Sequence, residues 1–289
     1  MNFVNSWLGE PWEDKAATMD SEAVQNRRSD IPMGIVPSWA QIITAGVDVQ
    51  KRGFYWTIRA WGYRMTSQNI AHGWAESFEE IEAIMNKVWP DEDRDLKWQV
   101  NLCAIDSGYS TEDVYDFCLQ NSDWCVPVKG AVTQKVGRFT RSAIDAIGKQ
   151  YHGQALYIVN GDSYKDLIAA RLRRPLGRGC WMAYAESDLE YAEQVTAEHK
   201  VATVKGGRCM ESWVPKTSHA QNHYLDAEVY AACAADLLQV RYLDEKDSGA
   251  VDGGVEGRQA QITARNNGTG KRRGVLCWGI HQGLISWIA

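Results

Sequence analysis

Close cysteine pairs are missing from this sequence. Its seven cysteines, an odd number, include no C-x-x-C spacing. This argues against a disulfide framework and against a cysteine zinc site, and it favours a reducing compartment. The sequence also lacks an apolar run of membrane-spanning length, and the N-terminal stretch MNFVNSWLGEPWEDK lacks the basic start and apolar core of a signal peptide. We therefore expect a cytoplasmic protein without a membrane segment.

An excess of positive charge is missing too. The 31 basic and 37 acidic residues give a formal net charge of -6. Any contact with nucleic acid must then come from local basic patches, or from metal ions that bridge acids to phosphates. A phosphate-binding G-x-x-x-x-G-K-[ST] motif does not occur, and GTGKRRG at 268–274 has the wrong glycine spacing. We expect no ATP-driven motor in this chain.

What the sequence does contain is enough apolar material for a sizeable core, with 45% hydrophobic residues in 289. Composition divides the chain into three parts. Residues 1–40 are polar and hold three prolines, which predicts a linker. Residues 41–243 carry the periodic patterns of a folded domain, and residues 244–289 are rich in Asp, Gly and Ser at first, which predicts a flexible tail.

Hydrophobic periodicity predicts an alternation of strands and helices in the middle part. Three runs over 42–75 indicate a meander of strands, and SFEEIEAIMNKVW at 77–89 begins with a capping box. The strand ending at Asp106 is followed by a helix. Further helices are predicted over 163–174, 187–200 and 222–240, with strands over 124–130, 155–160 and 211–215.

Three acids stand out because of their places in this pattern. Asp48 ends the apolar run TAGVDVQ, Asp106 ends the strand in CAIDSGYS, and Asp226 lies in the last helix. An unpaired carboxylate in a buried strand is costly. Such acids can meet at one edge of a sheet, where hard oxygen ligands suit two Mg²⁺ or Mn²⁺ ions. These residues are our candidate catalytic and metal-binding acids, although strand-end acids more often serve turns or caps.

Two basic segments and one histidine extend this hypothesis. The segment KGAVTQKVGRFTRS is predicted to be a mobile loop that follows phosphates, and RLRRPLGRG adds a second arginine group. The candidate DNA-binding residues are Lys129, Lys135, Arg138, Arg141, Arg173 and Arg174. Each could equally be a solvated surface charge. His223 lies three residues before Asp226, on the same helix face, and is a candidate extra metal ligand or a partner of an acid.

Five ordered motifs give a resemblance to a known family. TAGVDVQ, AIDSGYSTEDVY, PVKG, LYIVNGDSYKDLIAARL and NHYLDAEVYAACAA resemble the nuclease domain of the lambda-type phage terminase large subunit, and the leader FVNSWLGEPWE is similar to the segment after its packaging motor. The family's usual Arg-Asn-Glu before the helix acid is replaced here by QNHYLD, so only the Asn is kept. The resemblance covers about residues 3 to 240.

The resemblance implies an α/β, ribonuclease H-like mixed sheet flanked by helices. It also implies that Asp48, Asp106 and Asp226 carry two Mg²⁺ or Mn²⁺ ions, with Lys129 near the site. The expected function is a metal-dependent endonuclease that cleaves concatemeric viral DNA during packaging. The implied partners are double-stranded DNA, the terminase small subunit and the portal protein, in the host cytoplasm of a phage or prophage. Residues 1–40 would then follow the motor, which this chain lacks.

Other functions remain open from the sequence. One is a non-catalytic docking module for the portal or a partner subunit, for which the apolar stretch 275–289 would be suitable. Another is a different ribonuclease H-like enzyme, such as a junction resolvase or transposase, which would prefer branched DNA or transfer strands. A glycosidase that uses two carboxylates and tryptophan platforms is the most distant alternative, and it would act without metal.

Overall fold

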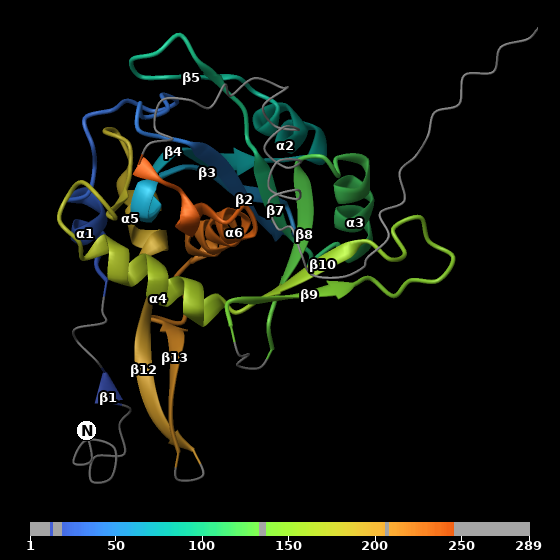
Figure 1. Ribbon diagram of the computed structural model, residues 1–289. Helices are drawn as coiled ribbons and strands as arrows, with labels where there is room; N and C mark the ends of the chain where they lie inside the picture. Colours follow the sequence, from blue (N-terminus) through green and yellow to red (C-terminus); the bar gives the residue numbers. More distant parts are fainter. Residues whose placement is uncertain (1–11, 14–18, 133–136, 206–207, 246–289) are drawn as a thin grey trace, which may run out of the picture.

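The computed structural model describes residues 12–13, 19–132, 137–205 and 208–245 (Figure 1). The strands are β1 (Trp12–Glu13), β2 (Ile42–Gln50), β3 (Gly53–Gly62), β4 (Thr66–Ala75), β5 (Trp89–Pro90), β6 (Lys97–Trp98), β7 (Leu102–Asp106), β8 (Cys125–Gly130), β9 (Phe139–Ala143), β10 (Ala155–Val159), β11 (Trp181–Met182), β12 (Glu198–Lys205) and β13 (Arg208–Pro215). The α-helices are α1 (Ser21–Gln25), α2 (Phe78–Met85), α3 (Thr111–Gln120), α4 (Gly161–Leu172), α5 (Leu189–Val195) and α6 (His223–Leu237), and two 3-10 turns are η2 (Tyr63–Met65) and η3 (Val240–Tyr242).

An eight-stranded mixed sheet forms the centre of the molecule, in the order β11-β4-β3-β2-β7-β8-β10-β9. The predicted meander is confirmed, because β2, β3 and β4 pair antiparallel. From β2 the sheet continues through β7, β8 and β10, which all run parallel to it. The fold class predicted from the sequence is therefore confirmed as a mixed α/β sheet flanked by helices, consistent with a ribonuclease H-like fold.

Helices cover both faces of the sheet, and each face has its own hydrophobic core. On one face α6 lies across β2, β3 and β7, with α4 and α5 packed against it (Figure 1). On the other face lie α2 and α3, over a core that includes Ile43, Ile58 and Ile105. A central strand covered on both sides has few places for polar residues. Eight of the nine β2 residues are buried, and Asp48 is one of them.

The backbones of β2 and α6 are in direct contact. A Cβ atom added at Gly46 would lie 2.0 Å from the carbonyl oxygen of Ala227 and 2.4 Å from the amide nitrogen of Ala231. Two residues earlier along β2, the Thr44 hydroxyl donates a hydrogen bond of 2.8 Å to the Ala231 carbonyl. Small residues on both elements thus fix the height of α6 above the sheet.

A buried carboxylate on α6 fixes the orientation of the helix. Glu228 is 1% exposed and forms an ion pair of 2.5 Å with Arg59 of β3. Thr57 and Tyr191 each donate to it at 2.6 Å, and Asn69 donates at 3.2 Å. Burial opposes ionisation of Glu228, but Arg59 and these donors outweigh it and hold the pKa of Glu228 below its usual range.

A three-stranded ribbon projects from the body of the protein. β12 and β13 pair antiparallel over their whole length, and β1 pairs with β12 on the other side. Figure 1 shows β12 and β13 extending away from the sheet beside α4. The helix predicted over 187–200 is wrong in its second half, because α5 ends at Val195 and β12 begins at Glu198. Pairing with β13 outweighs the weak helical pattern there.

Two further expectations differ from the structure. The predicted mobile basic loop is strand over Phe139–Ala143, because this segment pairs with β10 as the edge of the sheet. Part of the predicted linker is ordered: Val24 of α1 belongs to the core under α6, and Val36 belongs to the core on the other face.

The domain boundary at residue 40 stays a prediction, as does the tail 244–289, most of which lies outside the described residues. In the described parts of the chain, no helix is long and apolar enough to cross a bilayer.

Gly46→Ala is expected to lower the free energy of unfolding by about 3 kcal/mol, because the added methyl group overlaps backbone atoms of α6 that cannot rotate away. Urea denaturation followed by tryptophan fluorescence measures the change. Gly130→Ala is the control, since its methyl group would meet nothing within 4 Å, and its effect should stay within about 0.5 kcal/mol. Equal effects of the two substitutions would contradict the close contact.

Candidate metal-dependent active site

Asp48, Asp106 and Asp226 lie in one region of the structure. β2 and β7 run parallel with Val47 opposite Ile105, so Asp48, two residues before the end of β2, lies beside Asp106, which ends β7. Parallel neighbours lie about 4.8 Å apart. Asp226 comes from the first turn of α6, which lies over these strands. Burial and, after it, the negative charges of all three acids raise the pKa of one side chain, Tyr230, so all three acids lie near it.

Asp48 is buried but not unpaired. Its Oδ2 accepts a hydrogen bond of 2.8 Å from the Gln50 amide and lies 2.9 Å from His223 Nδ1. His223 begins α6, and its ring is stacked on Tyr55 with 4.5 Å between centroids. The histidine predicted as a possible ligand or partner of an acid is thus placed against Asp48, with its ring orientation fixed by the aromatic contact.

Asp106 is strongly affected by its surroundings. Burial and the like charge of Asp48 raise the pKa of Asp106 to about 6. The Gly108 backbone N–H, the Tyr230 hydroxyl and the positive charge of Lys129 oppose this rise. The Asp106 carboxylate therefore repels Asp48, and the nearby donors and Lys129 compensate its charge only in part. A cation between the two acids would relieve this repulsion.

Asp226 is in a similar state, although a lysine is close to it. Burial raises the pKa of Asp226 to about 6; the ammonium of Lys165 opposes the rise, whereas Asp48 and Glu198 add to it. The Lys165 Nζ lies 3.4 Å from Asp226 Oδ1 and 2.7 Å from Glu198 Oε1. Asn222 also spans the two acids, since its amide donates to Asp226 at 3.1 Å and to Glu198 at 2.7 Å.

Glu198 is a fourth acid of this site that the sequence did not reveal. It is 3% exposed, and its Oε2 is buried without a hydrogen-bond partner among the described residues. The expectation of a helix over 187–200 concealed that Glu198 begins β12.

Lys165 had a detectable signal, because it shares a face of α4 with the buried residues Ile168 and Ala169. A charge on that apolar face indicates a buried partner.

An open groove leads to these residues. A cleft of about 770 Å³ is lined by Lys165, Asp226 and Tyr230, together with the end of β8 and the start of α4. A second hollow of about 470 Å³ is lined in part by the same residues, among them Asp162 and Glu211, and continues along β13. Of the three acids only Asp226 lines this groove, which opens to solvent between the sheet edge and the ribbon.

The three acids provide hard oxygen donors of the kind that Mg²⁺ and Mn²⁺ prefer. Their number and their mutual repulsion fit bound divalent ions, and the raised pKa values of Asp106 and Asp226 show that positive charge is in short supply. In the part of the chain that the structure describes, no three His, Cys, Asp or Glu side chains are spaced to hold one ion. Each carboxylate instead contacts a protein partner, such as His223 for Asp48 and Lys165 for Asp226.

The predicted DNA-binding residues fall into different places. Lys129 is exposed at the end of β8, near Asp106, and Arg141 is exposed on the edge strand β9. Arg138 is partly used within the protein, because its Nη1 lies 3.2 Å from Asp236 Oδ2. Lys135 lies outside the described residues.

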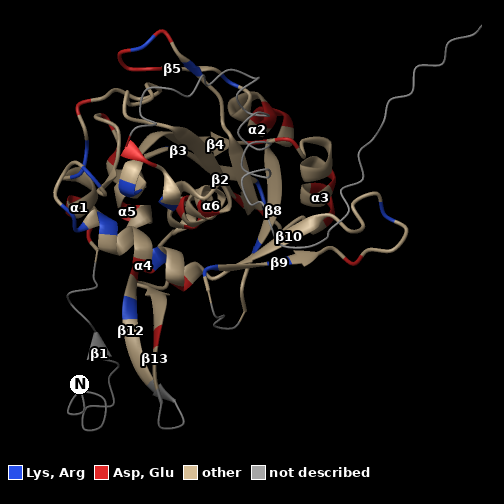
Figure 2. Cartoon of the chain, viewed as in Figure 1, with Lys and Arg blue, Asp and Glu red and all other residues tan. Residues whose placement is uncertain are grey.

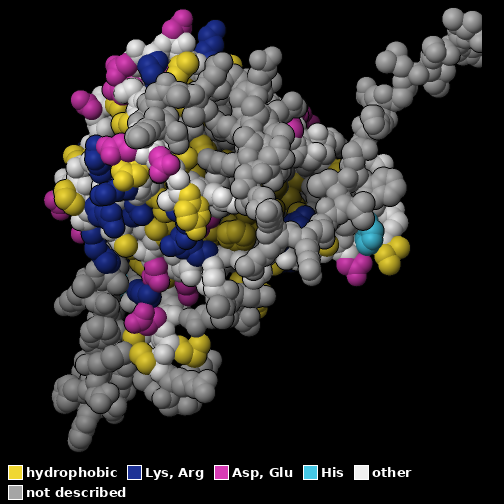
Figure 3. Space-filling view, in the orientation of Figure 1, with side chains coloured by type: hydrophobic (Ala, Val, Ile, Leu, Met, Phe, Trp, Pro, Cys, Tyr) yellow, Lys and Arg dark blue, Asp and Glu magenta, His cyan; other side chains and the backbone are white. Residues whose placement is uncertain are grey.

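Arg173 and Arg174 are exposed at the far end of α4, roughly 18 Å from its first turn. Arg174 belongs to an arginine group, because burial and the charges of Arg174, Arg138 and Arg241 lower the pKa of Arg171 to about 10. Basic residues lie along α4 and at α1 in Figure 2, and Figure 3 shows them gathered on this surface. Arg138 and Arg174 therefore lie in the same group, and this group is farther along α4 than the acidic site.

Two comparisons with known proteins match this chain. The family model of the endonuclease domain of the terminase large subunit gpA matches residues 1–247. A terminase large subunit from Escherichia phage lambda is 25% identical over 258 residues, which cover 83% of this chain and 39% of that protein. The chain therefore spans about two fifths of the length of this curated relative.

Asp106→Asn is expected to raise the free energy of unfolding by roughly 1–3 kcal/mol at pH 7.5 in EDTA, because it removes a repelled carboxylate. The folded-state pKa of about 6 lies above the ordinary 3.8. The folded wild type thus binds more protons than the unfolded chain between these values, and it gains stability as the pH falls. The advantage of the variant should shrink from pH 6 to pH 4.

Urea denaturation at several pH values measures this difference. Asp95→Asn, which changes an exposed acid between β5 and β6, is the control and should show little effect at any pH. An advantage of Asp106→Asn that stays constant from pH 7.5 to pH 4 would contradict the crowding of the acids.

Proposed function

The chain belongs to the family of terminase large-subunit endonuclease domains, and from this premise we propose that it is a metal-dependent endonuclease that cleaves concatemeric viral DNA during genome packaging. The observation that carries the proposal is the meeting of Asp48, Asp106 and Asp226 at one sheet edge, beside an open groove. A docking module without catalytic activity would have no use for three acids that destabilise each other.

We propose that Asp48, Asp106 and Asp226 hold two Mg²⁺ or Mn²⁺ ions. When bound, such ions lower the pKa of an attacking water and stabilise the leaving 3′ oxygen of a phosphodiester. His223 and Gln50 act as positioning residues in this proposal, because both contact Asp48 Oδ2 and limit its rotation. Tyr230 does the same for Asp106 from within α6.

Lys165 balances the site before metal binds. Its ammonium ion-pairs with both Asp226 and Glu198 and is 12% exposed. Burial lowers the pKa of Lys165, but the negative charges of Asp226 and Glu198 outweigh burial and raise it. A metal ion at Asp226 would compete with this ammonium, which could then pair with Glu198 alone. When no metal ion is bound, Lys165 thus offsets the repulsion between the neighbouring acids.

Basic residues near the acids and on the edge strand would position the duplex. Lys129 lies near Asp106 at the end of β8, and Arg141 lies on the edge strand β9, two strands beyond β8 in the sheet. Contacts of this kind bind phosphates and carry little sequence information. We propose double-stranded DNA as the substrate, with the terminase small subunit and the portal protein as partners in the host cytoplasm.

Asp48→Asn and Asp226→Asn are each expected to lower cleavage of supercoiled plasmid by more than about a hundredfold, because each removes a charged metal ligand. Nicking and linearisation are followed on gels in EDTA, Mg²⁺ or Mn²⁺, and Asp95→Asn should cut like the wild type. Thermal unfolding with and without Mn²⁺ gives a second readout: Mn²⁺ should raise the Tm of the wild type and not that of Asp48→Asn. Cleavage in EDTA, or full activity of Asp48→Asn, would refute the metal assignment.

Arg141→Ala is expected to weaken DNA binding and to reduce the slope of log K against log salt by about 0.9, the loss of one phosphate contact. Fluorescence anisotropy with a labelled duplex at several salt concentrations measures the slope. Lys97→Ala removes an exposed charge from β6, at the other end of the molecule, and should leave the slope unchanged. An unchanged slope for Arg141→Ala would mean that this arginine only faces solvent.

A further inference from the structure

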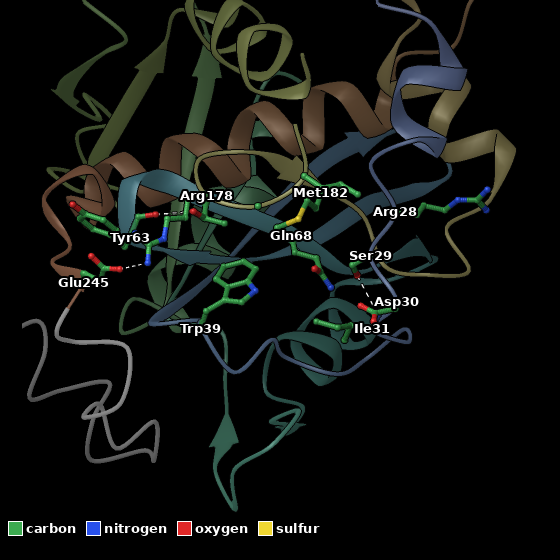
Figure 4. A pocket seen from close by; sticks show the side chains of 13 residues that line it. Arg28, Ser29, Asp30, Ile31, Trp39, Tyr63, Gln68, Arg178, Met182 and Glu245 are labelled. Atoms are coloured by element: carbon green, nitrogen blue, oxygen red, sulfur yellow. Dashed lines mark hydrogen bonds and ion pairs between the residues drawn. The ribbon is translucent and has the colours of Figure 1, made fainter. Parts of the chain in front are cut away.

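A second cavity lies away from the acids. Its volume is about 640 Å³, within the range of small-molecule sites, and it is formed by the loop at 28–31, the start of β4 and the loop at 176–178 (Figure 4). In the strand register Trp61 at this end pairs with Ile42, whereas Tyr55 pairs with Asp48. Six strand residues separate the two ends, which is roughly 20 Å. The cavity is therefore distinct from the acidic site.

Gln68 is the unusual residue of this cavity. Its side chain is fully buried, and both its Nε2 and its Oε1 lack a hydrogen-bond partner among the described residues. Ser67 and Asn69, its neighbours on β4, contact Arg59, Thr57 and Glu228 on the α6 side of the sheet. Gln68 points to the opposite side, and Figure 4 shows its amide directed between Trp39 and Ile31.

An unpaired buried amide costs roughly 1–3 kcal/mol for each unmet group. A side chain that keeps both a donor and an acceptor unpaired, at the wall of an open cavity, is suited to a ligand that offers an acceptor and a donor side by side. A buried glutamine that served only packing could be an apolar residue of the same length at no cost. The unmet groups thus define the hydrogen-bonding edge of the ligand.

The walls around Gln68 indicate the shape of that ligand. Trp39 and Tyr63 supply aromatic surfaces, and the buried side chains of Ile31 and Met182 complete an apolar lining. Figure 4 shows Trp39 beside the Gln68 amide. Flat aromatic and apolar surfaces on either side of a single polar edge favour a planar ring over a flexible chain.

Charge gathers at the rim of the cavity. Arg178 is exposed there and forms an ion pair with Glu245. The Arg28 guanidinium instead donates to the backbone carbonyls of Gln25 and Ser187, and Figure 4 shows it directed away from Gln68. An anionic group carried by the ligand could pair with the Arg178 guanidinium in place of its exposed salt bridge, which contributes little to stability. The rim therefore accepts a negative charge outside the apolar cavity.

We propose that this cavity binds a nucleobase, with Gln68 hydrogen-bonded to the edge of the base, Trp39 beside its ring, and the attached phosphate at Arg178. A glutamine amide matches the adjacent donor and acceptor of adenine, so adenine is the preferred base. A peptide would need several unpaired polar partners along its backbone, and among the described lining residues only the Gln68 side chain has buried polar atoms without a partner. The site goes beyond the proposed nuclease activity and does not depend on it.

Isothermal titration calorimetry with 2′-deoxyadenosine 5′-monophosphate tests the site on the full chain in EDTA. We expect saturable one-to-one binding by the wild type. Gln68→Met keeps the length and burial of the side chain but has no amide, and it should weaken binding at least about tenfold while the Tm stays equal or rises. Gln120→Met, an exposed change on α3, and Asp48→Asn should both bind like the wild type.

Ribose 5-phosphate is the probe without a base and should bind at least about tenfold more weakly than the nucleotide. Equal affinity for the two would overturn the proposal, because Arg178 would then bind phosphate alone. Unchanged affinity of Gln68→Met would overturn it as well, and so would the loss of binding in Asp48→Asn, which would place the nucleotide at the acids. Absence of saturable heat with the wild type would also refute the site.

Two sources of the base are distinguished by a second arm. A short duplex with one unpaired adenine is compared with the same duplex fully paired, using wild type and Gln68→Met. A preference for the unpaired adenine that depends on Gln68 would mean that the base comes from DNA. Nucleotide binding without such a preference would assign the site to a free nucleotide. Both results support the nucleobase site.

Discussion

The buried ion pair between Glu228 and Arg59 is the interaction on which the arrangement of this molecule depends. Glu228 satisfies its two oxygens with four side chains from β3, β4 and α5, so one residue of α6 ties the helix to three other elements. Breaking such a pair leaves an uncompensated charge in the interior and costs about 3–5 kcal/mol. Asp226 lies two residues earlier on the same helix, and its position relative to the sheet follows from that attachment.

The site that results is rigid and electrostatically unfavourable at once. Asp48, Asp106 and Asp226 come from two strands and a helix, and burial together with like charge raises the pKa of two of them. A fold that only maximised its stability would place neutral residues there. The penalty is tolerated because the contact of α6 with β2 and the Glu228 network stabilise the same elements from behind. Unfavourable electrostatics held in a firm frame are what the proposed cation site would require.

Much of the fold could be predicted from the sequence, because local patterns determine it. The meander over 42–75, the helix that begins after Ser77 and the long Ala-rich helix follow from periodicity and capping that each segment carries in itself. The failures have non-local causes. The segment after Val195 becomes strand because β13 pairs with it, and Phe139–Ala143 becomes an edge strand because β10 is available. Neither partner can be identified from the segment alone.

The same division applies to the two sites. The sequence by itself determined the three acids and the strand ends that carry Asp48 and Asp106, since an acid that ends an apolar run is visible in one dimension. Only the tertiary structure decided that His223 faces Asp48, that Lys165 bridges Asp226 and Glu198, and that Gln68 keeps an unpaired amide in an apolar cavity. These facts depend on distances between residues far apart in the chain, and such distances arise only when the helices pack on the sheet.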